Sequence, residues 1–73
     1  MKDLSQLPNA VKERRKLLGL TQRQVADLAG CHWTLVLDVE AGRTSVRLDK
    51  LVAILDVVGL TLGIGEARHH GAP

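Results

Sequence analysis

Residues 21–42 read TQRQVADLAGCHWTLVLDVEAG, and this stretch decides the fold. Thr21 followed by Gln24 is the pattern of a capping box, so a helix is expected to start there and to end at Gly30. A second helix is expected from about His32 to the glycine that closes the stretch. Two short helices joined by a tight turn predict a helix-turn-helix unit.

Apolar residues at helical spacing predict one further helix on each side, over residues 5–18 and 48–58. Ser5 is expected to cap the first of them, and Gly19 and Gly59 are expected to end the two. The fold class expected is therefore all-α. The side chains assigned to the buried faces of the four helices are Leu4, Leu7, Val11, Leu18, Val25, Leu28, Ala29, Leu35, Val36, Val39, Leu48, Leu51, Val52 and Leu55.

The stretch LTLGI at residues 60–64 alternates large apolar residues with small or polar ones, which is the pattern of a short β-strand. No other part of the sequence has this pattern, and a lone strand needs a partner from outside. We therefore predict that Leu60, Leu62 and Ile64 are buried where the strand pairs with its copy across a homodimer. The alternative is an extended tail that packs on the helices.

The composition is that of one small domain: 73 residues, 45% of them hydrophobic, with one tryptophan and no phenylalanine or tyrosine. The core must therefore be aliphatic, which suits packed helices. We expect the domain to span residues 1–65 and the polar residues 66–73 to form a flexible tail. One cysteine, no visible signal peptide and no apolar run of membrane-spanning length predict a soluble cytoplasmic protein.

Catalytic and metal chemistry have little support in the sequence. Cys31 and His32 are adjacent, but His69 and His70 lie far along the chain, without the spacing of zinc ligands. Cys31 is expected to be a small buried residue of the turn. No nucleophile–base constellation and no glycine-rich phosphate loop is evident, so we expect no enzyme, no metal and no cofactor.

The formal net charge of +2 is weak evidence for nucleic-acid binding, and the placement of the basic residues says more. The cluster KERRK at residues 12–16, taken alone, is explained by a solvated helix face. Arg43 and Arg47 flank a polar loop, and Arg23 lies near the expected start of a helix. This placement favours a partner that carries phosphate.

The chain resembles the Xre/Cro-type repressor family in LGLTQRQVADLAG (residues 18–30) and VEAGRTSVRLDKL (residues 39–51). Within that family it looks most like the HipB-type antitoxins, from QLPNAVKERRK (residues 6–16) to LDKLVAILDVVGLTLGI (residues 48–64). The resemblance implies a lambda-repressor-like helix-turn-helix domain of four to five helices. A strand directly after the last helix is a feature of the antitoxin subgroup.

The resemblance also implies roles for the matching positions. Residues that hold the phosphate backbone of DNA are matched by Gln22, Arg23, Arg43 and Thr44, and Arg47 joins this set. The face that touches base edges in family members is matched by His32, Trp33, Thr34, Leu37 and Asp38. Arg15 and Glu40 match a pair that forms an internal salt bridge between the first and third helices.

Trp33, Leu37 and Asp38 are unusual on a helix that reads bases. An apolar side chain can contact a thymine methyl, and a carboxylate can accept from the amino group of cytosine, although it repels phosphate. In the alternative interpretation, Trp33 and Leu37 form an exposed apolar patch that binds protein. His32 is expected to cap the helix or to contact phosphate, and the alternative is a solvated turn residue.

These features predict a sequence-specific repressor that binds double-stranded operator DNA as a homodimer. The resemblance further implies the antitoxin of a type II toxin–antitoxin operon, which represses its own operon and neutralises a kinase-like, HipA-like toxin. One alternative is a stand-alone or phage-type repressor of the same family. Another is a protein-interaction module that has lost DNA binding.

Overall fold

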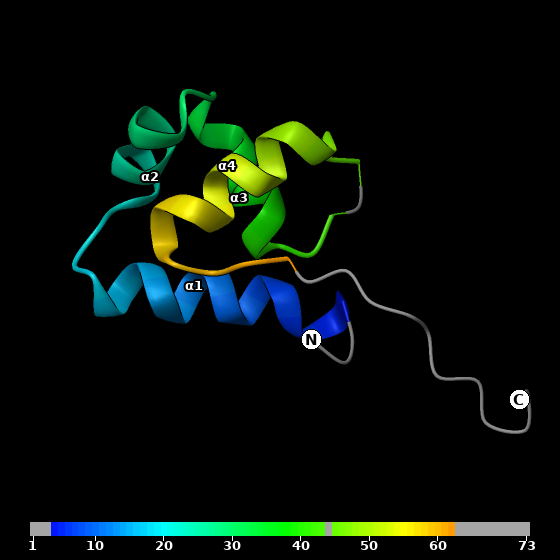
Figure 1. Cartoon of the computed structure of the whole chain (residues 1–73), viewed down its shortest axis with the longest axis horizontal. Helices are drawn as coiled ribbons and strands as arrows, with labels where there is room; N and C mark the ends of the chain where they lie inside the picture. Colours follow the sequence, from blue (N-terminus) through cyan, green and yellow to red (C-terminus); the bar gives the residue numbers. More distant parts are fainter. Residues whose placement is uncertain (1–3, 44, 63–73) are drawn as a thin grey trace, which may run out of the picture.

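The computed structural model describes residues 4–43 and 45–62 and folds them into four α-helices (Figure 1). A 3-10 turn at Leu4–Gln6 is followed by α1 (Leu7–Leu17), α2 (Gln22–Ala29), α3 (Trp33–Glu40) and α4 (Leu48–Val58). The prediction of an all-helical domain containing a helix-turn-helix is confirmed. None of the described helices has the length and apolar composition needed to cross a membrane.

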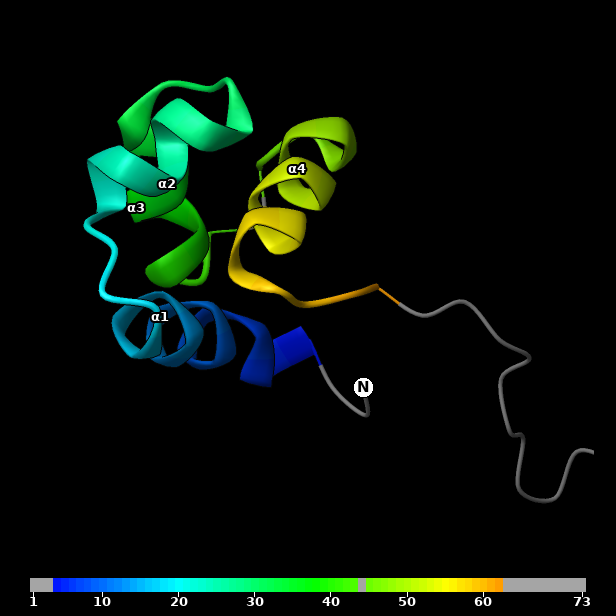
Figure 2. The ribbon, with the colours of Figure 1, turned by 60° about the vertical axis from the view of Figure 1, so that its left-hand side comes forward.

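The helices pack in two groups that share α3 and α4. On one side of the molecule α1 contacts α3 and α4, whereas α2 packs on α3 and α4 from the other side (Figures 1 and 2). The consecutive helices α2 and α3 form the helix-turn-helix, and α4 lies between α1 and α2. The helix-turn-helix is thus supported from behind by both flanking helices.

The core is aliphatic, as the composition predicts, and every α-helix contributes to it. Its buried members are Val11, Val25, Ala26, Val36, Val39, Ile54, Leu55 and Val58. Burial of a valine, leucine or isoleucine side chain stabilises a fold by roughly 1.5–3 kcal/mol. These residues therefore set the relative positions of the four helices.

Four leucine and valine residues that the sequence analysis assigned to buried faces lie at the surface instead. Leu18, Leu28, Leu48 and Val52 are 45%, 66%, 68% and 40% exposed. The reason is clearest in α4, whose sequence LDKLVAILDVV has apolar residues on every side, so their spacing does not single out one face. The buried side chains of that helix include Ile54 and Val58, which were not assigned.

All four predicted helix ends lie at glycines with positive φ. The φ angles of Gly19, Gly30, Gly42 and Gly59 are 72°, 71°, 81° and 80°, values that residues with a Cβ rarely adopt. The predicted start of the first helix is wrong. Ser5 lies in the 3-10 turn, and α1 begins after Gln6, whose side chain makes no capping hydrogen bond.

After α4 the chain turns, and residues 60–62 run beside α1 (Figures 1 and 2). Within this single chain these residues form no strand. Leu60 and Leu62 are partly buried against the core and Thr61 is exposed, so the predicted alternation is present over residues 60–62. Ile64, the side chain of Leu4 and the tail over residues 66–73 lie outside the described residues.

Candidate nucleic-acid interface

The start of α2 is fixed by the capping box predicted from the sequence. The Thr21 hydroxyl oxygen accepts from the backbone N–H of Gln24 at 3.0 Å, and Gln24 Oε1 accepts from the backbone N–H of Thr21 at 2.8 Å. Two N–H groups at the helix start are satisfied in this way. The adjoining residues Gln22 and Arg23 therefore occupy the first turn of a well-defined helix.

The start of α3 is capped by His32. Its Nδ1 accepts from the backbone N–H of Thr34 at 3.2 Å and lies 2.8 Å from the Thr34 hydroxyl oxygen. A ring nitrogen that accepts a hydrogen bond carries no proton, so this cap requires the Nδ1 of His32 to be unprotonated. Of the roles considered for His32, the structure shows capping.

The other end of α3 is tied to the rest of the domain through Glu40. Arg15 of α1 donates to both Glu40 oxygens, from Nε at 2.6 Å and from Nη2 at 3.0 Å. Gln22 of α2 adds a third bond, from Nε2 to Glu40 Oε1 at 3.2 Å. Arg15 Nη1 also donates to the carbonyl of Leu20, in the connection between α1 and α2. One carboxylate thus joins three helices.

This carboxylate is charged and almost fully buried, with 2% of the Glu40 side chain and 11% of the Arg15 side chain exposed. Burial alone raises the pKa of Glu40, but hydrogen bonds from Arg15 and Gln22 and the charges of Arg15 and Lys12 outweigh it, so the pKa lies below its ordinary value. The bond to Glu40 in turn raises the pKa of Arg15, against the opposing effect of burial.

Trp33, predicted to point outward, is partly buried. Its side chain packs against the core, and only part of it reaches the surface. The guanidinium carbon of Arg23 lies 4.8 Å from the centre of the indole, and the His32 ring lies 6.2 Å away at an interplanar angle of 29°. The free apolar patch of Trp33 and Leu37 is therefore smaller than expected.

The other residues predicted to contact DNA bases lie along α3. Leu37 is 41% exposed, and Thr34 and Asp38 are partly exposed. Asp38 Oδ1 lies 3.6 Å from Arg43 Nε, and the Asp38 carbonyl accepts from the backbone N–H of Arg43 at 3.0 Å. A predicted base-reading acid and a predicted phosphate-binding arginine therefore contact each other.

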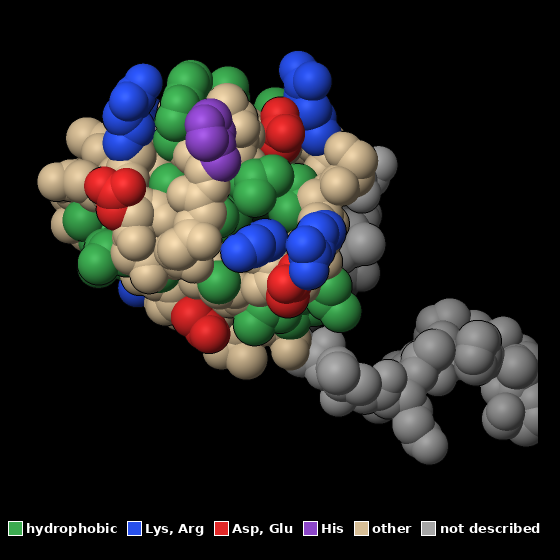
Figure 3. Space-filling view, turned by 90° about the horizontal axis from the view of Figure 1, so that it is seen from above, with side chains coloured by type: hydrophobic (Ala, Val, Ile, Leu, Met, Phe, Trp, Pro, Cys, Tyr) green, Lys and Arg blue, Asp and Glu red, His purple; other side chains and the backbone are tan. Residues whose placement is uncertain are grey.

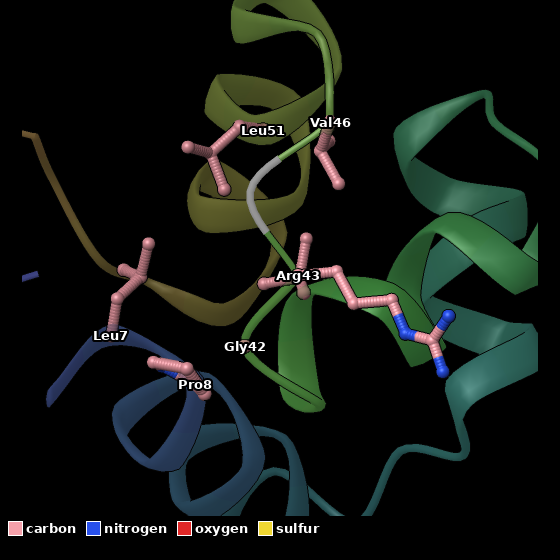
Figure 4. Close-up of a pocket in the computed structure, with 7 residues that line it drawn as sticks. Leu7, Pro8, Gly42, Arg43, Val46 and Leu51 are labelled. Carbon is pink, nitrogen blue, oxygen red and sulfur yellow. The ribbon is translucent and has the colours of Figure 1, made fainter. Parts of the chain in front are cut away.

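The loop after α3 carries the other predicted phosphate contacts. Arg43 helps to line an apolar pocket of about 160 Å³, together with residues that include Leu7, Pro8, Val46 and Leu51. Figure 4 shows its guanidinium group pointing away from Leu7, Pro8 and Leu51. Arg47, at the start of α4, pairs with Asp49 at 3.0 Å, and both side chains are largely exposed. Thr44 lies outside the described residues.

Sequence reasoning missed two contacts that charged side chains make with backbone carbonyls. Arg14 Nε donates to the carbonyl of Val58 at 2.9 Å and so caps the end of α4. Lys50 Nζ lies 3.4 Å from the carbonyl of Gly30, at the end of α2. Both acceptors are backbone carbonyls, which leave no signal in a sequence. Cys31 is partly buried, and burial raises the pKa of its thiol although Lys50 acts in the opposite direction.

These contacts divide the basic cluster at residues 12–16 into two kinds of residue. Arg14 and Arg15 bind internal acceptors, whereas Lys12 and Lys16 are exposed. Elsewhere on the surface, basic, acidic and histidine side chains lie around hydrophobic ones on the face seen in Figure 3.

A family model described as helix-turn-helix matches residues 11–64, which include all of α2, α3 and α4. The chain belongs to the helix-turn-helix family. A curated relative from Haemophilus influenzae, named an uncharacterized HTH-type transcriptional regulator, is 33% identical over 54 residues. That match covers 74% of this chain and 55% of the relative, so this helix-turn-helix chain spans little more than half of the relative's length.

A solved structure, named MDT Protein, has the same arrangement of helices. It superposes with a TM-score of 0.77 at 25% sequence identity, over 93% of this chain and 96% of the other. Nearly all of this helix-turn-helix chain is therefore covered by one known fold.

Proposed function

We propose that this helix-turn-helix chain binds double-stranded DNA through α3 and represses transcription in a sequence-specific manner. The observation that carries the proposal is the fixing of α3 at both ends, by the His32 cap and by the Glu40 contacts to α1 and α2. A helix that enters the major groove must present a few side chains in a defined orientation. The name of the Haemophilus influenzae relative, an HTH-type transcriptional regulator, also supports a role in transcription.

Contacts to phosphate and contacts to bases are assigned to different residues. Phosphate contacts, which supply affinity without sequence information, are assigned to Gln22, Arg23, Thr44, Arg43 and Arg47. Base contacts are assigned to the exposed part of α3, where Leu37 suits a thymine methyl and Thr34 suits a hydrogen bond. Asp38 is not assigned a base contact, because its carboxylate lies against Arg43.

The test is a titration of the protein with the DNA upstream of its own gene at several salt concentrations. Arg43→Ala should weaken binding to all sequences alike and lower the salt slope by about one ion per protomer. Lys16→Ala, which removes an exposed charge from α1, serves as the control and should leave the slope unchanged. Salt-independent binding, or a loss confined to one sequence, would contradict the assignment.

Leu37→Ala separates DNA reading from the alternative of a protein-binding patch. If α3 reads DNA, this substitution should weaken binding where a thymine methyl is available and leave other sites unaffected. Binding to operator variants with thymine or uracil at each position measures this, because uracil lacks only the methyl group. A folded Leu37→Ala variant with unchanged affinity for every operator variant would favour the protein-binding patch.

The finer proposal is that repression belongs to a toxin–antitoxin operon, with the chain acting as a homodimer that binds a kinase-like, HipA-like toxin. Its support is the sequence resemblance over residues 6–64 to the HipB-type antitoxins. Co-expression with the product of the adjacent reading frame provides the test. Relief of growth arrest and co-purification are expected, and a neighbouring frame without toxicity would favour a stand-alone repressor instead.

A further inference from the structure

Three side chains form a layered contact where α2 and α3 begin. The indole of Trp33 packs against the core, the Arg23 guanidinium lies over the ring at 4.8 Å from its centre, and the His32 ring is stacked beside it at 6.2 Å. His32 is itself fixed by its cap on α3. The core and the His32 ring therefore fix the position of the indole, and the Arg23 guanidinium lies over the indole ring.

Arg23 differs from the other arginines of the described part of the chain. Arg14 and Arg15 donate to internal acceptors, and Arg43 and Arg47 each pair with an acid. Within residues 4–43 and 45–62, Arg23 is the arginine whose side chain contacts an aromatic ring rather than an oxygen. A cation on an aromatic face is held by the ring's charge distribution and keeps its N–H donors available for an acceptor.

We propose that Trp33 is a positioning residue for Arg23, and that the indole holds the guanidinium where its N–H groups meet a DNA phosphate. Trp33 then contributes to affinity for every sequence and does not read bases. The inference rests on the proposed DNA binding and assigns to Trp33 a task different from the base contact expected of its position. Partial burial supports this task, because a side chain packed against the core has limited reach into a groove.

A double-mutant cycle with Trp33→Leu and Arg23→Ala tests the proposal by DNA titration. Trp33→Leu should weaken binding to operator and to unrelated DNA equally, by about two- to fivefold, which is the effect of an exposed cation–π contact. In the Arg23→Ala background the same substitution should have no further effect. Trp33→Phe, which keeps an aromatic face, should bind better than Trp33→Leu.

Additive losses in the cycle, or a change of preference at one base pair on Trp33 substitution, would overturn the proposal. If the wild-type protein binds no DNA, the failure belongs to the proposed function and not to the contact between these two side chains. Thermal melting shows whether each variant is folded.

A second measurement tests the contact without DNA and without substitution of Trp33. Trp33 is the sole tryptophan, so its fluorescence and its quenching by acrylamide report on this ring alone. Arg23→Ala should uncover the ring and raise the quenching constant, whereas the control Lys16→Ala should leave it unchanged. An unchanged constant in Arg23→Ala would show that the guanidinium does not rest on the indole, and the proposal would fail.

Discussion

Glu40 is the residue of α3 that binds side chains of two other helices. Its side chain accepts from Arg15 of α1 and Gln22 of α2 while 2% of it is exposed. A buried carboxylate in this position is stable only while its donors remain, since an unpaired buried charge carries a large desolvation cost. The pair therefore specifies how α3 sits relative to α1 and α2.

Glu40→Gln should lower the free energy of unfolding at neutral pH by roughly 3 kcal/mol, because it leaves the buried Arg15 without its counter-charge. Urea denaturation measures this. Asp49→Asn is the control, since it breaks the exposed pair with Arg47 and should cost less than about 1 kcal/mol. Equal effects of the two substitutions would contradict the importance of burial.

The ionisation of Glu40 should contribute to the pH dependence of the free energy of unfolding. The pKa of Glu40 is lower in the folded state than in the unfolded chain. The contribution of Glu40 to the free energy of unfolding is therefore fully present at pH values above the ordinary pKa of a glutamate carboxyl group. This contribution is lost as the pH falls through the pKa of the folded state. Wild-type stability should therefore decrease on acidification more steeply than that of Glu40→Gln, and parallel curves would count against the assigned pKa shift.

Asp38→Asn should tighten binding to every DNA sequence alike. The substitution removes a charge that repels phosphate and releases Arg43, whose Nε lies 3.6 Å from the carboxylate. Titration against the operator and its single-base variants checks this, with the exposed Asp56→Asn as a charge-matched control. A loss of about 1–3 kcal/mol at a single base pair would instead identify Asp38 as a base contact.

At the scale of elements, the end of α4 shows how a helix terminus is secured by a residue distant in sequence. Arg14 donates from Nε to the carbonyl of Val58, and Gly59 follows with a φ of 80°. A Cβ at Gly59 would lie 2.9 Å from Arg14 Nη2, so a larger residue would displace the guanidinium. The backbone angle favours glycine here, and an added Cβ would also require the end of the Arg14 side chain to move.

Gly59→Ala should therefore destabilise the domain more than Gly19→Ala. At Gly19, with φ 72° and no atom within 4 Å of an added Cβ, the cost is that of the left-handed backbone, about 1–2 kcal/mol. At Gly59 the loss of the Arg14 hydrogen bond adds about 1 kcal/mol. Thermal unfolding compares the two, and in an Arg14→Met background the difference between them should disappear.

Apart from the start of α1, the ends of the helices were predictable from the sequence, whereas the faces that the helices bury were predictable only in part. Gly19, Gly30, Gly59 and the Thr21 capping box depend on local backbone chemistry, which the sequence records directly. The face of α4 depends on which neighbours it meets, and its apolar residues surround the helix. Leu48 and Val52 were misassigned for that reason.

The candidate site was also predictable only in part: the sequence indicated which residues belong to it but not how they contact one another. The type and spacing of residues drew attention to Arg23, Trp33, Asp38 and Arg43. Their mutual contacts, Arg23 with Trp33 and Asp38 with Arg43, depend on side-chain conformations that spacing does not define. The Arg15–Glu40 pair was expected from family resemblance, and the structure places these side chains in a bidentate ion pair.

At the scale of the whole molecule, the segment after α4 is the expected site of assembly. Leu60 and Leu62 line a groove of about 170 Å³ together with Leu7, Ala10 and Leu55. A second chain that paired with residues 60–64 would extend this apolar surface and form backbone hydrogen bonds with the segment. We expect the spacing of the two recognition helices in such a dimer to be set here.

Deletion of residues 60–73 should shift the protein from dimer to monomer and weaken operator binding. Deletion of residues 66–73 is the matched control and should leave the dimer intact, because it spares the predicted strand. Sedimentation velocity measures both. A dimer that persists without residues 60–73 would place the interface on another surface.

The three hydrogen bonds to Glu40 have a thermodynamic consequence for binding. Because α3 is joined to α1 and α2 before any ligand arrives, little ordering remains to be done on association. Isothermal titration should then give a heat capacity change that the apolar area of the contact alone explains, without the larger negative value that accompanies coupled folding. In Glu40→Gln, whose recognition helix is less firmly held, the heat capacity change of binding should become more negative than in the wild type.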